Sequence, residues 1–188
     1  MPPERCSARR SSKPRSPTKS SSSCARWSNA GPVSPRLPAQ HEVLARRLAG
    51  SPHLSAGQQQ AALGALARTP PGDRLCHGDF HPGNILLTDG GEYIIDWVDA
   101  TCGSPAADVA RSCLLFLGHI ATTPEPAEVR AAMQRFHDAY LARYAARSSV
   151  SAEECRAWLP ILAATRLREG IPEQREWLLA QVRQAFGP

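Results

Sequence analysis

Two short apolar runs separated by a glycine-containing turn constrain the fold of this 188-residue chain more than any other feature. Residues 85–87 and 93–95 are apolar or aromatic, and residues 88–91, with the sequence Thr-Asp-Gly-Gly, lie between them. Glycine allows the positive φ angles that tight turns need, so the pattern predicts a β-hairpin. A hairpin brings its outer ends together. We therefore expect Asn84 and Asp96, which flank the two runs, to meet at its open end.

Asn84 and Asp96 are chemically suited to share a cation, with Asp79 facing the same cavity. Mg²⁺ prefers hard oxygen ligands and retains several waters, so one amide oxygen and one carboxylate suffice. Asp79 is the first acidic residue of a turn-rich loop, where a carboxylate can orient a hydroxyl and accept its proton. Each residue alone has a simpler explanation, since Asp beside Gly is common in turns and an Asp can end a strand. The combination, in this order and spacing, favours phosphoryl-transfer chemistry.

The segment that carries these residues resembles the C-terminal lobe of the aminoglycoside phosphotransferase and choline kinase family, which shares the protein-kinase fold. The matching residues are His77-Gly78-Asp79-Phe80-His81-Pro82-Gly83-Asn84, Ile95-Asp96-Trp97, Gly103-Ser104-Pro105 and Asp108-Val109-Ala110-Arg111. By this resemblance, Asp79 is the catalytic base, while Asn84 and Asp96 hold the metal. His77 would support the loop by packing and hydrogen bonding, and Asp108 would brace it through backbone N–H groups.

The resemblance also implies substrates and a cofactor. Enzymes of this kind use ATP and Mg²⁺ to phosphorylate a hydroxyl of a small molecule, of the aminoglycoside or amino-alcohol type, which links the family to antibiotic resistance. A cationic acceptor would suit acidic side chains, and Asp99, on the loop beyond Asp96, is the most plausible contact. Glu169, Glu173 and Glu176 gather near a helix junction, where carboxylates are usually solvated. The cysteines form no C-x-x-C pair, so a reducing cytoplasm is expected.

The N-terminal part of the sequence departs from that family. Members carry a sheet lobe with a Gly-rich loop and a phosphate-contacting lysine, whereas the only lysines here, Lys13 and Lys19, lie in a tract rich in Ser, Pro and Arg. Residues 1–40 hold eight Arg and Lys residues against one Glu, which predicts a disordered basic tail. A basic tract can bind nucleic acid or a membrane, but this one shows neither an amphipathic helix nor interleaved aromatic residues, so no such partner is expected. We expect residues 41–188 to be a C-lobe whose N-terminal sheet lobe is missing. The chain would then be truncated and inactive alone.

Two other functions are compatible with the sequence. His77, Asp79 and His81 form an H-x-D-x-H pattern that could chelate a transition metal in a hydrolase, because imidazole and carboxylate ligands suit Zn²⁺ or Mn²⁺. Alternatively, the chain is a non-catalytic remnant, a folded C-lobe without its nucleotide lobe. Tightly bound zinc would favour the hydrolase, and ATP turnover would separate the kinase from the remnant.

Apolar periodicity predicts that the rest of the chain is mostly helical. Ser104 and Pro105 begin one helix, which Pro124 ends. Gly170 closes a later helix, and Pro172 opens the last one. The predicted helices cover residues 58–67, 105–123, 129–144, 153–168 and 172–186. The predicted fold class is therefore α+β and mostly helical, a protein-kinase-like C-lobe with a small β-hairpin at the catalytic site.

Overall fold

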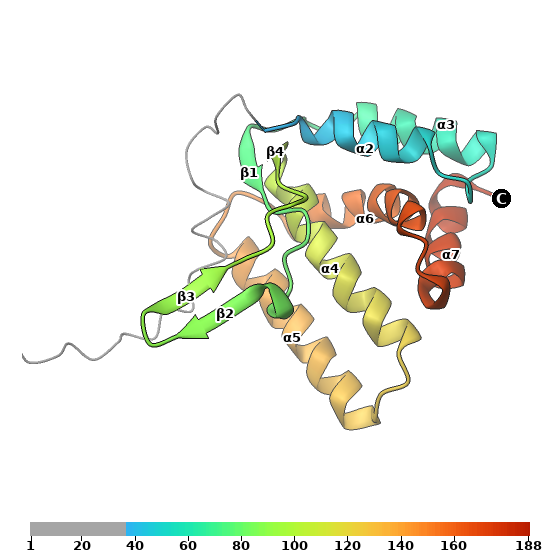
Figure 1. The fold of residues 1–188 in the computed structure, drawn as a ribbon. Coiled ribbons are helices and arrows are strands. Elements are labelled where there is room, and N and C mark those ends of the chain that lie inside the picture. Colours follow the sequence, from blue (N-terminus) through green and yellow to red (C-terminus); the bar gives the residue numbers. More distant parts are fainter. Residues whose placement is uncertain (1–36) are drawn as a thin grey trace, which may run out of the picture.

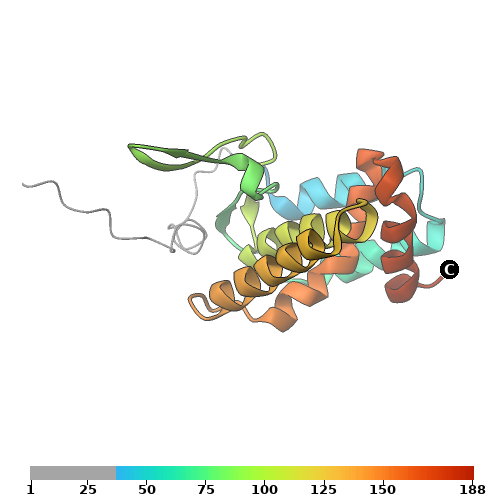
Figure 2. The same ribbon diagram turned by 90° about the horizontal axis from the view of Figure 1, so that it is seen from below.

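Helices that pack around α6 form the body of the molecule, and a β-hairpin projects from it (Figures 1 and 2). The structure, a computed structural model, describes residues 37–188. Its helices are α2 (Gln40–Ala49), α3 (Ala56–Ala67), α4 (Pro105–Thr122), α5 (Ala127–Ala145), α6 (Ala152–Arg166) and α7 (Arg175–Phe186). Its strands are β1 (Arg74–Cys76), β2 (Ile85–Thr88), β3 (Gly91–Ile94) and β4 (Thr101–Gly103). Short 3₁₀ turns cover Pro82–Asn84, Leu167–Glu169 and Pro172–Gln174. The architecture is thus α+β and mostly helical, as predicted.

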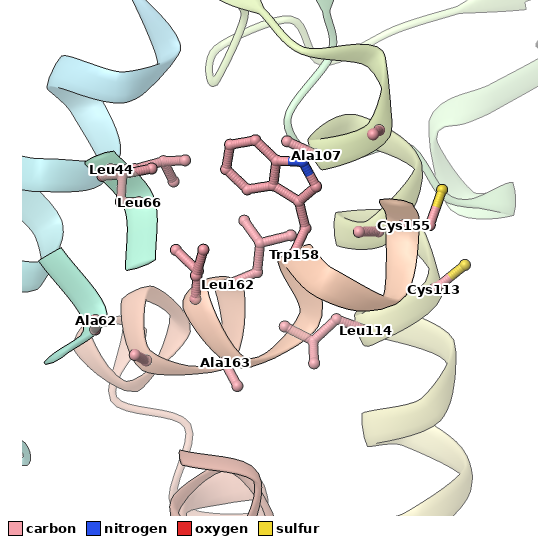
Figure 3. Close-up of a cluster of buried hydrophobic side chains, with 14 of the residues drawn as sticks. Leu44, Ala62, Leu66, Ala107, Cys113, Leu114, Cys155, Trp158, Leu162 and Ala163 are labelled. Carbon is pink, nitrogen blue, oxygen red and sulfur yellow. The ribbon is translucent and has the colours of Figure 1, made fainter. Parts of the chain in front are cut away.

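The hydrophobic core lies where α4 and α6 meet the other helices (Figure 3). Trp158 and Leu162 of α6 are 2% and 4% exposed and share one cluster with Leu44 of α2 and Leu66 of α3. Leu114 joins the cluster from α4. Burying a large apolar side chain stabilises a fold by roughly 1.5–3 kcal/mol. The same cluster includes Leu178 and Val182 of α7, so the core ties α6 to helices from both ends of the described sequence.

Local signals in the sequence set most of the helix boundaries. Pro105 is the first residue of α4, as predicted, although the Ser104 side chain makes no capping hydrogen bond. The helix ends at Thr122, two residues before Pro124. After α6, the 3₁₀ turn stops at Gly170, whose φ of 69° lies in the left-handed region that glycine adopts most readily. These positions confirm the predicted start of α4 and the predicted break between the last two helices.

The strands form two separate antiparallel pairs within residues 37–188. The first joins β1 to β4, with Leu75 opposite Cys102. The second is the predicted hairpin of β2 and β3, in which Leu86 lies opposite Tyr93. The hairpin is confirmed, and its turn is tighter than expected because Thr88 pairs with Gly91 and leaves only two residues between the strands.

The fold begins slightly before the predicted boundary at residue 41. Helix α2, which was not among the predicted helices, starts at Gln40, and Ala39 forms an isolated bridge with Cys102. The main-chain N–H of Cys102 donates to the Pro38 oxygen over 3.0 Å. Of the segment expected to be a disordered tail, residues 1–36 lie outside the described part of the chain.

Helix α5 differs from the expected amphipathic pattern. Tyr144 is buried as an apolar stripe predicts, but Val129 and Phe136 are 41% and 51% exposed. Helix α5 packs mainly along α4, where the ring of Phe136 contacts that of Phe116 but stays half exposed. No helix in this part of the chain is long and apolar enough to cross a lipid bilayer.

Candidate active site

A loop between β1 and the hairpin carries His77, Asp79 and Asn84, and Asp108 of α4 fixes the start of that loop. The Asp108 carboxylate accepts hydrogen bonds from two consecutive backbone N–H groups, those of His77 at 3.0 Å and Gly78 at 2.7 Å. It lies in the first turn of α4, where the helix dipole favours a negative charge. Enclosure by the protein raises the pKa of Asp108, and the two backbone N–H groups oppose that rise. The loop is thereby anchored to α4.

His77 is buried and uses both ring nitrogens within the loop. Its Nδ1 accepts from the backbone N–H of Asp79 over 3.2 Å, which leaves the proton on Nε2 to be donated to the main-chain oxygen of Ile95 at 2.9 Å. Its ring also packs against Trp97, with ring centroids 4.6 Å apart. His77 therefore links the segment that contains Asp79 to the segment that precedes Asp96.

Asn84 lies at the base of the hairpin and is 7% exposed. Its Nδ2 donates to the main-chain oxygen of Asp79 at 2.9 Å, so its Oδ1 is the atom left for another partner. The backbone N–H of Ile95 donates to the main-chain oxygen of Asn84 at 3.0 Å, and Asp96 is the next residue after Ile95 in the sequence. The structure therefore joins the loop to the end of the hairpin at Asn84 and Ile95.

Asp96 is the one non-glycine residue with a positive φ within residues 37–188, at 62°. Its side chain is exposed. Asp tolerates this conformation better than most residues, but it still costs free energy and is concentrated at functional sites. No three His, Cys, Asp or Glu side chains gather as a metal-binding group in the described part of the chain. A cation at Asn84 and Asp96 would thus take few protein ligands, as Mg²⁺ does.

Asp79 lies beside the guanidinium of Arg111, a residue to which the sequence motif had given no role in the site. Its side chain is 29% exposed, and its Oδ1 lies 3.4 Å from Nη2 of Arg111, whose side chain is only 8% exposed. Arg111 also donates from Nε to the Gly78 main-chain oxygen at 3.1 Å. The spacing offers a signal, because Arg111 follows Asp108 by three residues and so shares its helix face. Asp108 and Arg111 hold the loop from one helix.

The acidic residues considered as acceptor contacts are mostly engaged by arginines. Asp99 pairs with Arg47 of α2 at 2.6 Å. Glu169 contacts two buried arginines, and Glu176 pairs with Arg183 at 3.2 Å on the exposed face of α7. A cationic ligand would have to compete with these arginines. The structure therefore does not bring these carboxylates together as a free anionic surface.

The geometry does not favour the hydrolase pattern of His77, Asp79 and His81. Both nitrogens of His77 are occupied by hydrogen bonds within the loop. Nδ1 of His81 accepts from the backbone N–H of Gly83 at 3.1 Å, and its Nε2 lies 3.6 Å from Asp79. A metal at these three side chains would have to displace hydrogen bonds that shape the loop.

A family model described as the phosphotransferase enzyme family matches residues 23–149, more than half of the chain. The matched region contains the whole loop, the hairpin and helix α4, which carries Asp108 and Arg111, but it ends before α6. No curated protein matches the chain significantly.

Proposed function

Because the chain belongs to the phosphotransferase enzyme family, we propose that its site serves the transfer of the ATP γ-phosphoryl group to a hydroxyl of a small molecule. The fold is then a protein-kinase-like C-lobe. The observation that carries the proposal is the connection between Asp79 and the end of the hairpin, through Asn84 and Ile95. In this proposal Asp79, Asn84 and Asp96 act together, in the order that this chemistry needs.

Asp79 is the catalytic base in this proposal. Its carboxylate orients the acceptor hydroxyl and takes its proton while the hydroxyl oxygen bonds to phosphorus and the bond to the leaving ADP oxygen breaks. Partial exposure of Asp79 leaves room for the acceptor. His77 and Asp108 hold the loop in position through their hydrogen bonds to its backbone. By family resemblance, the acceptor is of the aminoglycoside or amino-alcohol type.

Asn84 and Asp96 fit a magnesium ion. The Asn84 amide uses its nitrogen for Asp79, which leaves its oxygen as a ligand, and Asp96 supplies an exposed carboxylate. Mg²⁺ at this point would neutralise charge on the ATP phosphates. Two protein oxygens leave the remaining positions of an octahedral ion to phosphates and water.

The hairpin offers an apolar face for the nucleotide base. Leu86 and Tyr93 are directly opposite each other, so their side chains lie on the same face, and Ile95 continues that face two residues further on. These side chains are 49%, 53% and 36% exposed. A flat purine could cover part of this surface, and this supports ATP as the phosphoryl donor.

Residues 37–188 lack a lysine and contain only two-stranded sheets. The described site therefore has no lysine to contact the phosphates and no larger sheet to cover them. Losing one preorganised charge contact costs about 10²–10³ in rate. We propose that the chain acts as a C-lobe and turns over no ATP without a sheet lobe supplied by other residues.

Isothermal titration of Mg·ATP into the full chain tests the site. We expect weak, Mg²⁺-dependent binding that Asp96→Ala removes and that Asp89→Ala, a control in the exposed hairpin turn, retains. Equal binding by both variants, or tight zinc binding without nucleotide, would contradict the proposed site. Multiple turnover of ATP by the chain alone, abolished by Asp79→Ala, would instead overturn the need for a sheet lobe.

A further inference from the structure

Two carboxylates, Asp79 and Glu169, contact the same nitrogen of Arg111. Nη2 of Arg111 lies 2.8 Å from Oε1 of Glu169 and 3.4 Å from Oδ1 of Asp79. Charge-assisted hydrogen bonds between guanidinium and carboxylate are usually about 2.7–2.9 Å long. The contact with Glu169 has this length, whereas the contact with Asp79 is longer. Arg111 is thus bound to Glu169 more closely than to the proposed base.

Glu169 is itself fixed by a second arginine. Its Oε2 lies 2.6 Å from Nη1 of Arg166, and Nε of Arg166 donates to Oε1 of Gln174 at 2.9 Å. The 3₁₀ turn that follows α6 places Glu169 three residues after Arg166, and Gly170 ends this turn. Both oxygens of Glu169 are therefore occupied. A role in binding a cationic acceptor would require this carboxylate to give up one of its arginines.

The two arginines need Glu169 because both are nearly inaccessible to water. Their side chains are each 8% exposed. Burial lowers the pKa of Arg166, the positive charge of Arg111 lowers it further, and Glu169 and Asp79 oppose the change. Buried charges of like sign are unfavourable unless an opposite charge is close. If the charge of Glu169 were absent, Asp79 would be the carboxylate that remains to offset these two cations.

We propose that Glu169 is a positioning residue, which draws Arg111 away from the carboxylate of Asp79. This inference rests on the proposed role of Asp79 as the base. Arg111 still orients the loop, because its Nε binds the Gly78 main-chain oxygen independently of either carboxylate. A carboxylate in a close guanidinium pair has its oxygen committed to that pair, so the longer contact with Arg111 leaves Oδ1 of Asp79 accessible to an acceptor hydroxyl.

The structure of Glu169→Gln tests the proposal without requiring turnover. We expect Nη2 of Arg111 to close on Oδ1 of Asp79, from 3.4 Å in the present structure to about 2.8 Å. Glu176→Gln, which removes an exposed carboxylate paired with Arg183, is the matched control and should leave the Asp79 contact unchanged. An unchanged distance in Glu169→Gln would overturn the proposal.

A coupling measurement provides a second readout. The double-mutant cycle of Asp79→Asn and Arg111→Lys is measured by urea unfolding, first with Glu169 present and then in Glu169→Gln. We expect the coupling to rise by about fivefold in the unfolding equilibrium constant when Glu169 is replaced. A purely structural Glu169 would lower overall stability without strengthening this pair, so an equal or weaker coupling would contradict the proposal. The NMR signals of the Arg111 Nη–H groups, followed in the single variant, report the same movement if a multiple variant fails to fold.

These results separate the positioning role from the proposed function. If Glu169→Gln leaves Arg111 in place while Mg·ATP still binds the wild-type chain, the positioning role fails and the proposed site stands. If Arg111 closes on Asp79 but no nucleotide binds under any condition, the competition for Arg111 is real and the proposed phosphoryl transfer is the part that fails.

Discussion

Asn84 donates from Nδ2 to the main-chain oxygen of Asp79 over 2.9 Å. This hydrogen bond joins the proposed metal ligand to the proposed base through the backbone. Because Asn84 is nearly buried, water cannot readily replace a lost donor. Loss of this hydrogen bond should therefore lower the free energy of unfolding, whether or not a ligand is bound.

Asn84→Asp should destabilise the protein by about 1–3 kcal/mol, because a carboxylate oxygen would face the Asp79 main-chain oxygen without a proton between them. Urea unfolding at pH 7 measures the change. Asp89→Asn, in the exposed hairpin turn, is the matched control and should alter the free energy of unfolding by less than about 0.5 kcal/mol. A stable Asn84→Asp variant would show that this hydrogen bond does not hold the loop.

Gly78→Ala should be more costly than Gly170→Ala, although both glycines have a positive φ. A Cβ at Gly78 would lie 2.6 Å from the Asp99 main-chain oxygen, whereas a Cβ at Gly170 would meet no atom within 4 Å. The backbone conformation alone costs roughly 1–2 kcal/mol at each position. Forcing the Asp99 segment away from Gly78 should bring the total there above about 3 kcal/mol. Equal losses of stability in thermal or urea unfolding would refute the predicted close contact.

The start of α6 should confer a pH-dependent stability. Ser151 and Glu154 each accept a hydrogen bond from the other's backbone N–H, at 3.1 Å and 2.7 Å, and these bonds with Ser151 lower the pKa of Glu154. The unfolded chain therefore protonates Glu154 more readily than the folded protein does. Glu154 stabilises the fold above its ordinary pKa of 4.5, and this stabilisation is lost as the pH falls through the lowered pKa.

Glu154→Gln tests that pH dependence. The wild-type protein should be more stable than this variant at pH 7 by less than about 1 kcal/mol, since the side chain is exposed, and the difference should vanish near pH 3. Ser151→Ala should cost about 1 kcal/mol at pH 7. A difference between wild type and Glu154→Gln that grows on acidification would contradict a lowered pKa for Glu154 in the folded protein.

The buried cysteines should resist alkylation in the native protein. Burial raises the pKa of Cys113 to about 12 and that of Cys155 to about 11, and it also raises the pKa of Cys76. Since the thiolate is the reactive form, iodoacetamide at pH 8 should label these three far more slowly than the half-buried Cys102. Peptide mass spectrometry measures the rates, and labelling in urea provides the control. Equal native rates for all four would show that the core opens readily.

Local patterns in the sequence predicted the parts of the fold that depend on neighbouring residues. The glycine-containing turn predicted the hairpin, and Pro105 and Gly170 predicted helix boundaries, because each acts on the backbone within a few residues. The pairing of Asn84 with the end of the hairpin followed from the same local geometry. These features required no knowledge of the tertiary arrangement.

The remaining features depend on contacts between distant segments. Arg111 and Glu169 lie on different helical elements, and only the packing of α4 against the end of α6 brings their charges together. The stripe that includes Val129 and Phe136 has the spacing of a buried helix face, yet periodicity does not specify whether a partner covers it. Here tertiary packing, rather than local preference, determined the outcome.

The projecting hairpin has a consequence for how any ligand affinity should be interpreted. Strands β2 and β3 pair only with each other within residues 37–188, and a two-stranded ribbon is at best marginally stable in water. We therefore expect its amides to exchange with deuterium long before those of α6. A nucleotide that needs the paired ribbon would bind only the molecules in which the ribbon is formed, so its apparent affinity would scale with that fraction. Affinity at this site is thus also a measure of local folding.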